Sequence, residues 1–255
     1  MVGSLQDKTL IVTGAGGGIG RAASIVLAGA GANVVVSDII EDAGRATVEV
    51  VQSSGGIAVF VKADLASEAD VRTLVERAVS TYGRLDGAFN NAGLEQCALP
   101  LHELTTEQWE RALRVDLTSV FWCLKYQVLA MLPTGGGAIV NTASSLGQVA
   151  IQNASEYIAA KHAVVGLTRA AAAEYGGRGI RVNAVLPGII RTPMIARLTE
   201  DARFSTFFEK LKDRHSIGRF GEPSEIGEAV KWLLSDAASF MNGAAMAVDG
   251  GYLSI

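Results

Sequence analysis

Tyr157 and Lys161 are the two side chains whose types and spacing most clearly suggest chemistry. They stand four residues apart at the start of a helical stretch, "YIAAK", which continues into "HAVVGLTRAAAAEYG". On a helix this spacing puts both side chains on one face, with their Cβ atoms about 5–6 Å apart. A free phenol has a pKa of about 10 and is a poor base at neutral pH, whereas a nearby ammonium favours its deprotonated form. The pair is therefore either a device for moving a proton or a buried ring beside a lysine whose charged end reaches water.

A glycine-rich turn near the start of the chain has the pattern of a phosphate-binding loop. The segment "TLIVTGAGGGIGRAASIVLAGAG" passes from an apolar strand through Gly14, Gly18 and Gly20 into a helix. Glycines there let the backbone turn tightly and approach a pyrophosphate, which rests on the positive end of the helix dipole. The alternative is a tight turn that binds nothing.

Asp38 closes the second apolar strand, "NVVVSD", 18 residues after Gly20. A carboxylate at that place can accept hydrogen bonds from an adenosine ribose and repels a 2′-phosphate. The segment "GAGGGIG" also holds no Lys or Arg that would attract such a phosphate. The pattern favours NAD over NADP, although Asp38 could instead be a helix-capping or loop acid.

Expected strands and helices alternate along the whole chain, and they must position these residues. Most of the expected strands are apolar throughout, which is typical of a parallel sheet covered on both faces. Residues 223–235 show the i, i+3, i+4, i+7 apolar spacing of an amphipathic helix. We therefore expect one doubly wound α/β domain over residues 1–255. The expected strands are 9–14, 33–38, 57–64, 85–91, 137–143, 180–188 and 245–251.

Composition excludes several other functions. The net charge is −4 and no basic cluster is visible, which argues against nucleic acid or an anionic membrane as partner. Cys97 and Cys123 lack metal-binding spacing, as do His102, His162 and His215, so we expect free thiols and no metal. No secretory signal and no apolar run of about 18 residues is apparent. We expect a cytoplasmic protein.

Five motifs in order resemble the short-chain dehydrogenase/reductase family. They are TGxxxGxG at 13–20, "NNAG" at 90–93, the set Ser144, Tyr157 and Lys161, "PG" followed by "TPM" within 187–194, and "VDGG" at 248–251. The resemblance covers essentially the whole chain. It implies a Rossmann-type domain with about seven parallel strands, a nicotinamide cofactor, a small alcohol or ketone substrate, and a homotetramer.

The resemblance also implies a role for each matching residue. Tyr157 would exchange the proton of the substrate hydroxyl, Lys161 would hold the nicotinamide ribose, and Ser144 would hydrogen-bond the substrate oxygen. The residues implied to bind or shape the cofactor site are Thr13, Gly14, Gly16, Gly18, Ile19, Gly20, Asp38, Asp64, Leu65, Asn90, Asn91, Ala92, Gly93, Tyr157, Lys161, Pro187, Gly188, Ile190, Thr192 and Met194.

One position departs from the family pattern. Where the family normally has Asn in a kinked helix, this chain reads "RVDLTSVF", with Asp116 at that position. The backbone carbonyl of the usual Asn helps to hold a water linked to the catalytic Lys. A carboxylate near Lys161 would favour the charged lysine, and we expect catalysis with an altered proton relay, in which Asp116 joins the catalytic set. The alternative is that Asp116 faces solvent or an arginine and matters little.

The substrate side is the least determined by the sequence. We expect Glu95, Gln96, Leu146 and Gln152 to line it, with a lid around residues 194–218. Three phenylalanines at 204, 207 and 208 suggest an apolar substrate, although the same segment could be a plain amphipathic helix. The phrases "LDGAFNNA", "KHAVVGLTR" and "WLLSDAASF" are similar to those of family members that oxidise cyclic diols and cyclohexanol-like alcohols.

Three functions therefore remain open from the sequence. The first is an NAD(H)-dependent oxidoreductase acting on a secondary alcohol, for which a cyclic or bulky apolar alcohol is one option. The second is a 3-oxoacyl thioester reductase acting on an acyl carrier protein substrate, against which Asp38 weighs because most such members use NADPH. The third is a non-catalytic dinucleotide sensor, against which the intact Ser144, Tyr157 and Lys161 weigh.

Overall fold

Seven parallel strands form one sheet in the computed structural model, which describes residues 3–193, 195 and 212–254. Their order across the sheet is β3-β2-β1-β4-β5-β6-β7, and every neighbouring pair is parallel. The expected doubly wound α/β fold is confirmed. The strands are β1 Thr9–Thr13, β2 Asn33–Asp38, β3 Ile57–Lys62, β4 Gly87–Asn90, β5 Gly137–Thr142, β6 Ile180–Pro187 and β7 Ala245–Val248.

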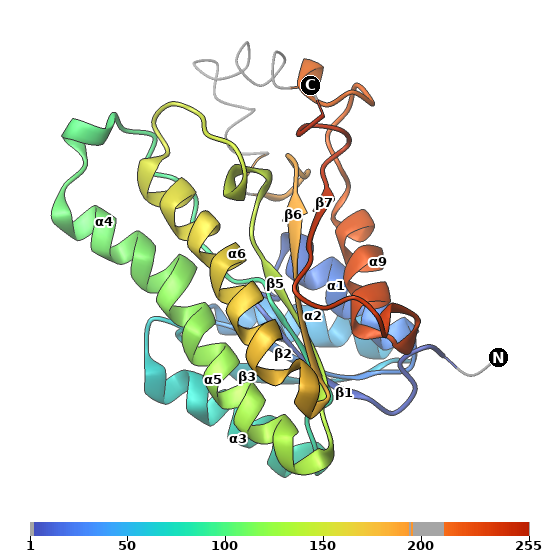
Figure 1. Cartoon of the computed structure of the whole chain (residues 1–255). Coiled ribbons are helices and arrows are strands. Elements are labelled where there is room, and N and C mark those ends of the chain that lie inside the picture. The colour runs from blue at the N-terminus through green and yellow to red at the C-terminus, as the bar shows by residue number, and fades with distance from the viewer. Residues whose placement is uncertain (1–2, 194, 196–211, 255) are drawn as a thin grey trace.

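Helices cover both faces of this sheet (Figure 1). Those of one face, α1, α2 and α9, share a core cluster, and α3, α5 and α6 share the other. The helices are α1 Gly18–Gly29, α2 Glu41–Ser53, α3 Glu68–Tyr82, α4 Thr106–Leu113, α5 Ser119–Met131, α6 Ser155–Tyr175 and α9 Pro223–Leu234. Short turns of 3-10 helix are η1 Leu101–Glu103, η3 Leu132–Thr134, η4 Ser145–Gly147, η5 Gly176–Arg178 and η6 Asp236–Ala238, and the π-turn η2 Arg114–Thr118 joins α4 to α5.

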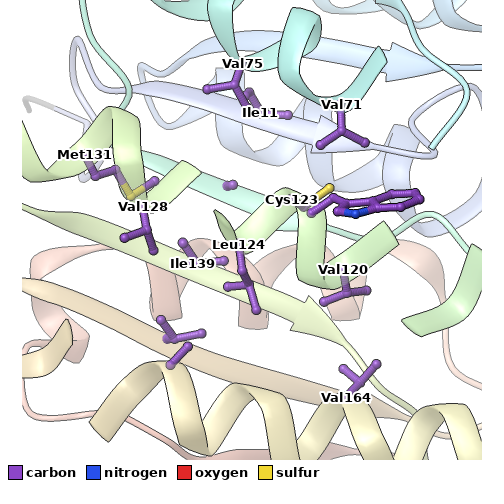
Figure 2. Close-up of a cluster of buried hydrophobic side chains, with 14 of the residues drawn as sticks. Ile11, Val71, Val75, Val120, Cys123, Leu124, Val128, Met131, Ile139 and Val164 are labelled. Carbon is purple, nitrogen blue, oxygen red and sulfur yellow. The ribbon is translucent and has the colours of Figure 1, made fainter. Parts of the chain in front are cut away.

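The central strands are apolar on both faces because each face is covered. Along β1, Leu10 and Val12 belong to the cluster under α1 and α9, whereas Ile11 belongs to the cluster under α3, α5 and α6. Successive strand side chains point to opposite faces, so an uninterrupted apolar run supplies both cores. In Figure 2, Ile11 and Ile139 of the sheet lie among Val120, Leu124 and other residues of the helices.

The helical run Thr106–Thr134 is long and apolar enough to cross a bilayer when only length and composition are considered. Half of its most apolar window is buried within the protein. In that run α5 contributes Val120, Cys123, Leu124 and Val128 to the core. We therefore interpret the run as a core helix.

The strand order reverses direction between β1 and β4, which are neighbours in the sheet although they are distant in sequence. The chain crosses from β1 toward β3 on one side, and from β4 toward β7 on the other. In open α/β sheets this divergence leaves a crevice outside the carboxyl ends of the strands, where ligands bind. The glycine turn after β1, Asp38 at the end of β2 and the segment after β4 all reach this edge.

Two adjacent valines of α2 provide a test of how far this packing stabilises the fold. Val51 is 1% exposed in the core, whereas Val50 is 40% exposed on the same helix. Replacing either by alanine changes helix propensity equally, so the difference between the variants isolates burial. We expect Val51→Ala to lower the free energy of unfolding by about 2 kcal/mol more than Val50→Ala, measured by urea denaturation. Equal losses would contradict the packing described here.

Candidate active site

A cavity of about 870 Å³ opens at the carboxyl edge of the sheet. It gathers residues from the ends of six strands, as the reversal of strand order requires. Most of the residues predicted for the site line it. They are Gly14, Gly16, Gly18, Ile19, Asp38, Asp64, Leu65, Asn91, Ala92, Gly93, Glu95, Gln96, Ser144, Leu146, Tyr157, Lys161, Pro187, Gly188, Ile190 and Thr192.

The other predicted residues lie elsewhere. Thr13, Gly20, Asn90 and Asp116 are buried beneath the cavity wall rather than on it. Gln152 is exposed and is not part of the cavity lining, so the structure does not bring it to the predicted substrate side. Met194 and most of the predicted lid, including the phenylalanines at 204, 207 and 208, fall outside the described residues.

The glycine turn is shaped as a cradle. Gly14 has φ +61°, and a Cβ there would lie 2.8 Å from Cα of Ala92. At Gly20 a Cβ would lie 2.2 Å from the carbonyl oxygen of Gly14, so the helix must start against the turn without a side chain. Gly17 has open space where a Cβ would stand, and no side chain caps the start of α1. Free backbone N–H groups therefore face the cavity, as a bound pyrophosphate requires.

The carboxylate of Asp38 at the cavity can accept more hydrogen bonds than it receives within the protein. Its Oδ2 accepts a hydrogen bond from Gly16 N at 2.8 Å, and its Oδ1 accepts one from Ile40 N at 2.9 Å. An ionised carboxylate offers about four acceptor sites, so ribose hydroxyls can still bind. Arg21, the cation next to the turn, donates to Gly16 O and to Thr47 Oγ1 beneath it. The residues present fit a dinucleotide whose ribose lies beside Asp38.

Thr13 and Asn91 join the glycine turn to the segment after β4. The hydroxyl of Thr13 accepts hydrogen bonds from Asn91 N at 2.9 Å and from Ala92 N at 3.1 Å. In return Asn91 Nδ2 donates to Thr13 O at 3.1 Å. These contacts span the point where strand order reverses. They hold the two sides of the crevice at a set separation.

A buried amide network lies below the centre of the site. Asn90 Nδ2 donates to Gln127 Oε1 at 3.0 Å and to Asn141 Oδ1 at 2.9 Å, and Gln127 Nε2 returns a bond to Asn90 Oδ1 at 2.7 Å. Asn141 Nδ2 then donates to Thr168 Oγ1 on α6 at 3.0 Å. Buried polar groups that are all paired fix their elements relative to one another. Asn90 therefore supports the floor of the site.

Lys161 and Tyr157 lie on one face of α6, as their spacing predicts. The ammonium of Lys161 stands 5.3 Å from the centroid of the Tyr157 ring. Lys161 is only 3% exposed, and its Nζ donates to Thr142 O at 3.2 Å. The ammonium and the phenol ring thus lie side by side, with the ammonium shielded from water. The interpretation of Lys161 as a solvated lysine is not supported.

Asp116 places a buried carboxyl group beside this cation. It sits in the π-turn Arg114–Thr118 at 1% exposure, and its Oδ1 lies 3.6 Å from Lys161 Nζ. The same oxygen accepts a hydrogen bond from Leu94 N at 2.9 Å. Burial raises the pKa of the Asp116 carboxyl, while Lys161 and the Leu94 N–H act in the opposite direction. The alternative of a solvent-facing Asp116 is wrong, because its side chain points inward onto Lys161.

Ser144 begins the turn that follows β5. Its Oγ accepts a hydrogen bond from Leu146 N at 3.1 Å and lines the cavity. The neighbouring Ser145 is buried, and its Oγ donates to Pro187 O at 3.0 Å. Both serines line the cavity, but the hydroxyl of Ser145 is bonded to the end of β6, so Ser144 is the one placed to donate to a bound molecule.

Sequence reasoning missed several cavity residues. Ile39 and Ile40 directly follow Asp38 at the end of β2, so their position in the sequence could have indicated that they line the cavity. Arg111, Arg114, Val115 and Ile151 carried no local signal, because only the packing of α4 and of the turn before α6 brings them to the cavity. His215 is buried and its Nε2 accepts a hydrogen bond from Ile189 N at 3.1 Å, which supports the turn after β6.

This arrangement can move a proton and a hydride. Ser144, Tyr157 and Lys161 line one cavity with the glycine cradle and Asp38. Among the described residues, no three His, Cys, Asp or Glu side chains are grouped to hold a metal ion. The groups that the cavity offers are a hydroxyl donor, a phenol beside a buried ammonium, and a dinucleotide cradle. Together they suit the oxidation of an alcohol or the reduction of a ketone.

Comparison with known proteins agrees with this chemistry. A family model described as Enoyl-(Acyl carrier protein) reductase matches residues 14–253. The chain is 50% identical over 253 residues to 2,5-dichloro-2,5-cyclohexadiene-1,4-diol dehydrogenase of Sphingobium indicum, covering 98% of this chain and 99% of that protein. It is 46% identical over 254 residues to cyclohexanol dehydrogenase of an Acinetobacter species, covering 100% of this chain and 98% of that protein.

Solved structures agree as well. Levodione reductase has a TM-score of 0.95 at 36% identity, covering 98% of this chain and 99% of that chain. A structure from Beutenbergia cavernae, with a TM-score of 0.92 at 37% identity over 98% of each chain, holds NADP at low occupancy. The motifs, the fold, the cavity and these matches lead to one conclusion: the chain belongs to the short-chain dehydrogenase/reductase family and is an oxidoreductase that acts on CH–OH groups.

Proposed function

We propose that the protein is an NAD-dependent dehydrogenase that oxidises a cyclic secondary alcohol to the ketone. The observation that carries this proposal is the buried Lys161 beside the half-buried Tyr157 in the same cavity as Ser144 and the glycine cradle. The two curated relatives at 50% and 46% identity are both named for cyclic alcohols, which supports that substrate class.

In the proposed reaction, Tyr157 takes the proton of the substrate hydroxyl. Ser144 donates a hydrogen bond to the substrate oxygen as negative charge develops there. The glycine cradle and Lys161 would hold a nicotinamide dinucleotide, which would supply the acceptor for the hydride of the carbinol carbon. Lys161, held by Thr142 O and Asp116, places its ammonium beside the phenol ring. For ketone reduction the same groups act in reverse.

The cavity wall beyond Ser144 and Tyr157 supports an apolar, ring-sized substrate. Leu94, Leu146 and Ile151 line it beside two hydrogen-bonding side chains, Glu95 and Gln96. Ligand sites commonly combine apolar walls with a few polar groups that fix orientation. A ring that carries one or more oxygens suits this mixture.

Asp38 supports NAD as the cofactor. Its carboxylate faces the cavity beside Gly16 and would repel a 2′-phosphate. The Beutenbergia relative holds NADP, so the family fold accommodates either cofactor and the choice depends on local charge. An NAD preference also weighs against the acyl carrier protein reductase alternative.

We further propose that the enzyme works in the cytoplasm as a homotetramer. Cys97 and Cys123 are both free thiols, as is usual in a reducing compartment. Exposed apolar side chains on α5, Phe121 and Leu129, and near the end of α9, Trp232 and Phe240, support association with further copies of the chain.

The first test replaces the phenol. Tyr157→Phe removes the group that exchanges the substrate proton, so we expect kcat/KM for cyclohexanol-type alcohols to fall by about 10²–10⁴-fold. NADH binding, followed by the fluorescence of the bound nicotinamide, should persist. Tyr175→Phe, at the far end of the same helix, is the control and should keep wild-type activity. Undiminished biological function in Tyr157→Phe would favour the dinucleotide-sensing alternative.

The second test concerns the cofactor. We expect the wild-type protein to bind NADH more tightly than NADPH, and Asp38→Ala to reduce this preference by roughly tenfold, because a charged hydrogen-bond acceptor is lost. Fluorescence titration with both dinucleotides measures the ratio. Asp42→Ala removes the same charge from an exposed position on α2 and should leave the preference intact. Tighter binding of NADPH by the wild type would overturn the assignment of Asp38.

The third test addresses the departure at Asp116. When ionised, this carboxylate lies 3.6 Å from Lys161 and offsets part of the positive charge that stands beside the Tyr157 ring. Asp116→Asn removes the negative charge and keeps an oxygen for the Leu94 N–H. We therefore expect the acid limb of the pH profile of kcat/KM for alcohol oxidation to move by about one unit toward lower pH. Asp42→Asn should not move it, and an unmoved limb in Asp116→Asn would contradict the altered relay.

A further inference from the structure

The segment 94–97 is held at both ends by buried carboxylates. It follows β4 and places Leu94, Glu95 and Gln96 on the cavity wall. At its start, Leu94 N donates to Asp116 Oδ1 at 2.9 Å. At its end, Cys97 N donates to Glu156 Oε1 at 2.6 Å. Short hydrogen bonds from an N–H to a carboxylate are among the stronger ones in proteins.

Glu156 is an unusual residue for its position. It is 1% exposed in the first turn of α6, and it precedes Tyr157 directly. Its second oxygen, Oε2, is buried and has no hydrogen-bond partner among the described residues. Such buried unpaired atoms are rare and costly, so each one calls for an explanation.

The surroundings show that Glu156 does not serve as a simple ion-pair partner. The charged groups in its neighbourhood are Asp116, which in turn pairs with Lys161, and Arg111, which lies near Cys97. Lys161 is held by Asp116 and by Thr142 O, and no ion pair joins it to Glu156 among the described residues. The contacts that account for the placement of the Glu156 carboxylate come from Cys97, through the hydrogen bond from its N at 2.6 Å and through its neighbouring thiol.

We propose that Glu156 is a positioning residue that holds the substrate wall in register with Tyr157. Glu156 and Tyr157 are consecutive on α6, so one rigid element fixes both the acid–base group and the end of segment 94–97. The inference rests on the proposed function for the identity of the substrate, which is a ring alcohol that contacts Leu94, Glu95 and Gln96. Proper placement of that ring sets the carbinol carbon in reach of the nicotinamide.

Amide hydrogen exchange tests the contact without any substrate. In the unliganded protein, we expect Glu156→Ala to raise the exchange rate of the Cys97 amide by roughly tenfold or more, since its acceptor is lost. Glu156→Asp keeps the charge but retracts the acceptor and should do the same. Glu156→Gln keeps an oxygen at the same reach and should stay protected. Glu174→Ala, on the exposed face of the same helix, is the control.

Kinetics then test the functional role. We expect Glu156→Ala and Glu156→Asp to raise KM for the cyclic alcohol by roughly tenfold with a smaller change in kcat, and to leave NADH affinity unchanged. Glu156→Gln should restore KM to within about twofold of the wild type. Unchanged exchange in both Ala and Asp variants would overturn the contact, and a KM defect in Gln as large as in Ala would overturn the positioning role. Absence of activity in the wild type would count against the proposed function and leave the exchange result standing.

Discussion

The buried ammonium of Lys161 is the constraint on which the rest of the site depends. A charge removed from water must be paired and hydrogen-bonded, or the fold loses several kcal/mol. Two separate elements meet this need: the end of β5 with Thr142 O, and the π-turn between α4 and α5 with Asp116. Such turns are frequent at functional sites, and here the π-turn carries the carboxyl that faces Lys161.

The topology explains why these elements meet. β4 and β5 leave the sheet on the far side of the strand-order reversal from β2 and β3, so the cofactor cradle and the proton-transfer groups approach from opposite directions. Thr13 bridges the two sides by accepting hydrogen bonds from Asn91 N and Ala92 N. Below them, Asn90 and Asn141 connect β4 and β5 to α5 and α6. The position of Lys161 is therefore set by the sheet as well as by its own helix.

Much of this could be predicted from the sequence because local patterns carry it. Apolar runs located the strands to within a few residues, and the spacing of Tyr157 and Lys161 placed both on one face of α6. Contacts between distant residues could not be predicted. The hydrogen bond between Cys97 N and Glu156 joins positions 59 residues apart, and no helical or strand periodicity in the sequence predicts it. Gln152 is a residue for which the sequence suggested a contact that the structure does not show. An amide side chain suits a substrate contact, but the turn before α6 leaves Gln152 exposed.

The two halves of the cavity are consequently built by different means. The cofactor half relies on backbone, with open space at Gly17 and a turn at Gly14 that tolerates no side chain. The substrate half relies on side chains that reach across the fold, Asp116 to Leu94 N and Glu156 to Cys97 N. The shape of a backbone cradle changes little when neighbouring side chains are substituted. A wall held by side chains shifts when the side chains that hold it are substituted. Differences in alcohol preference within this family can therefore arise in segment 94–97 and its anchors while the dinucleotide cradle is retained.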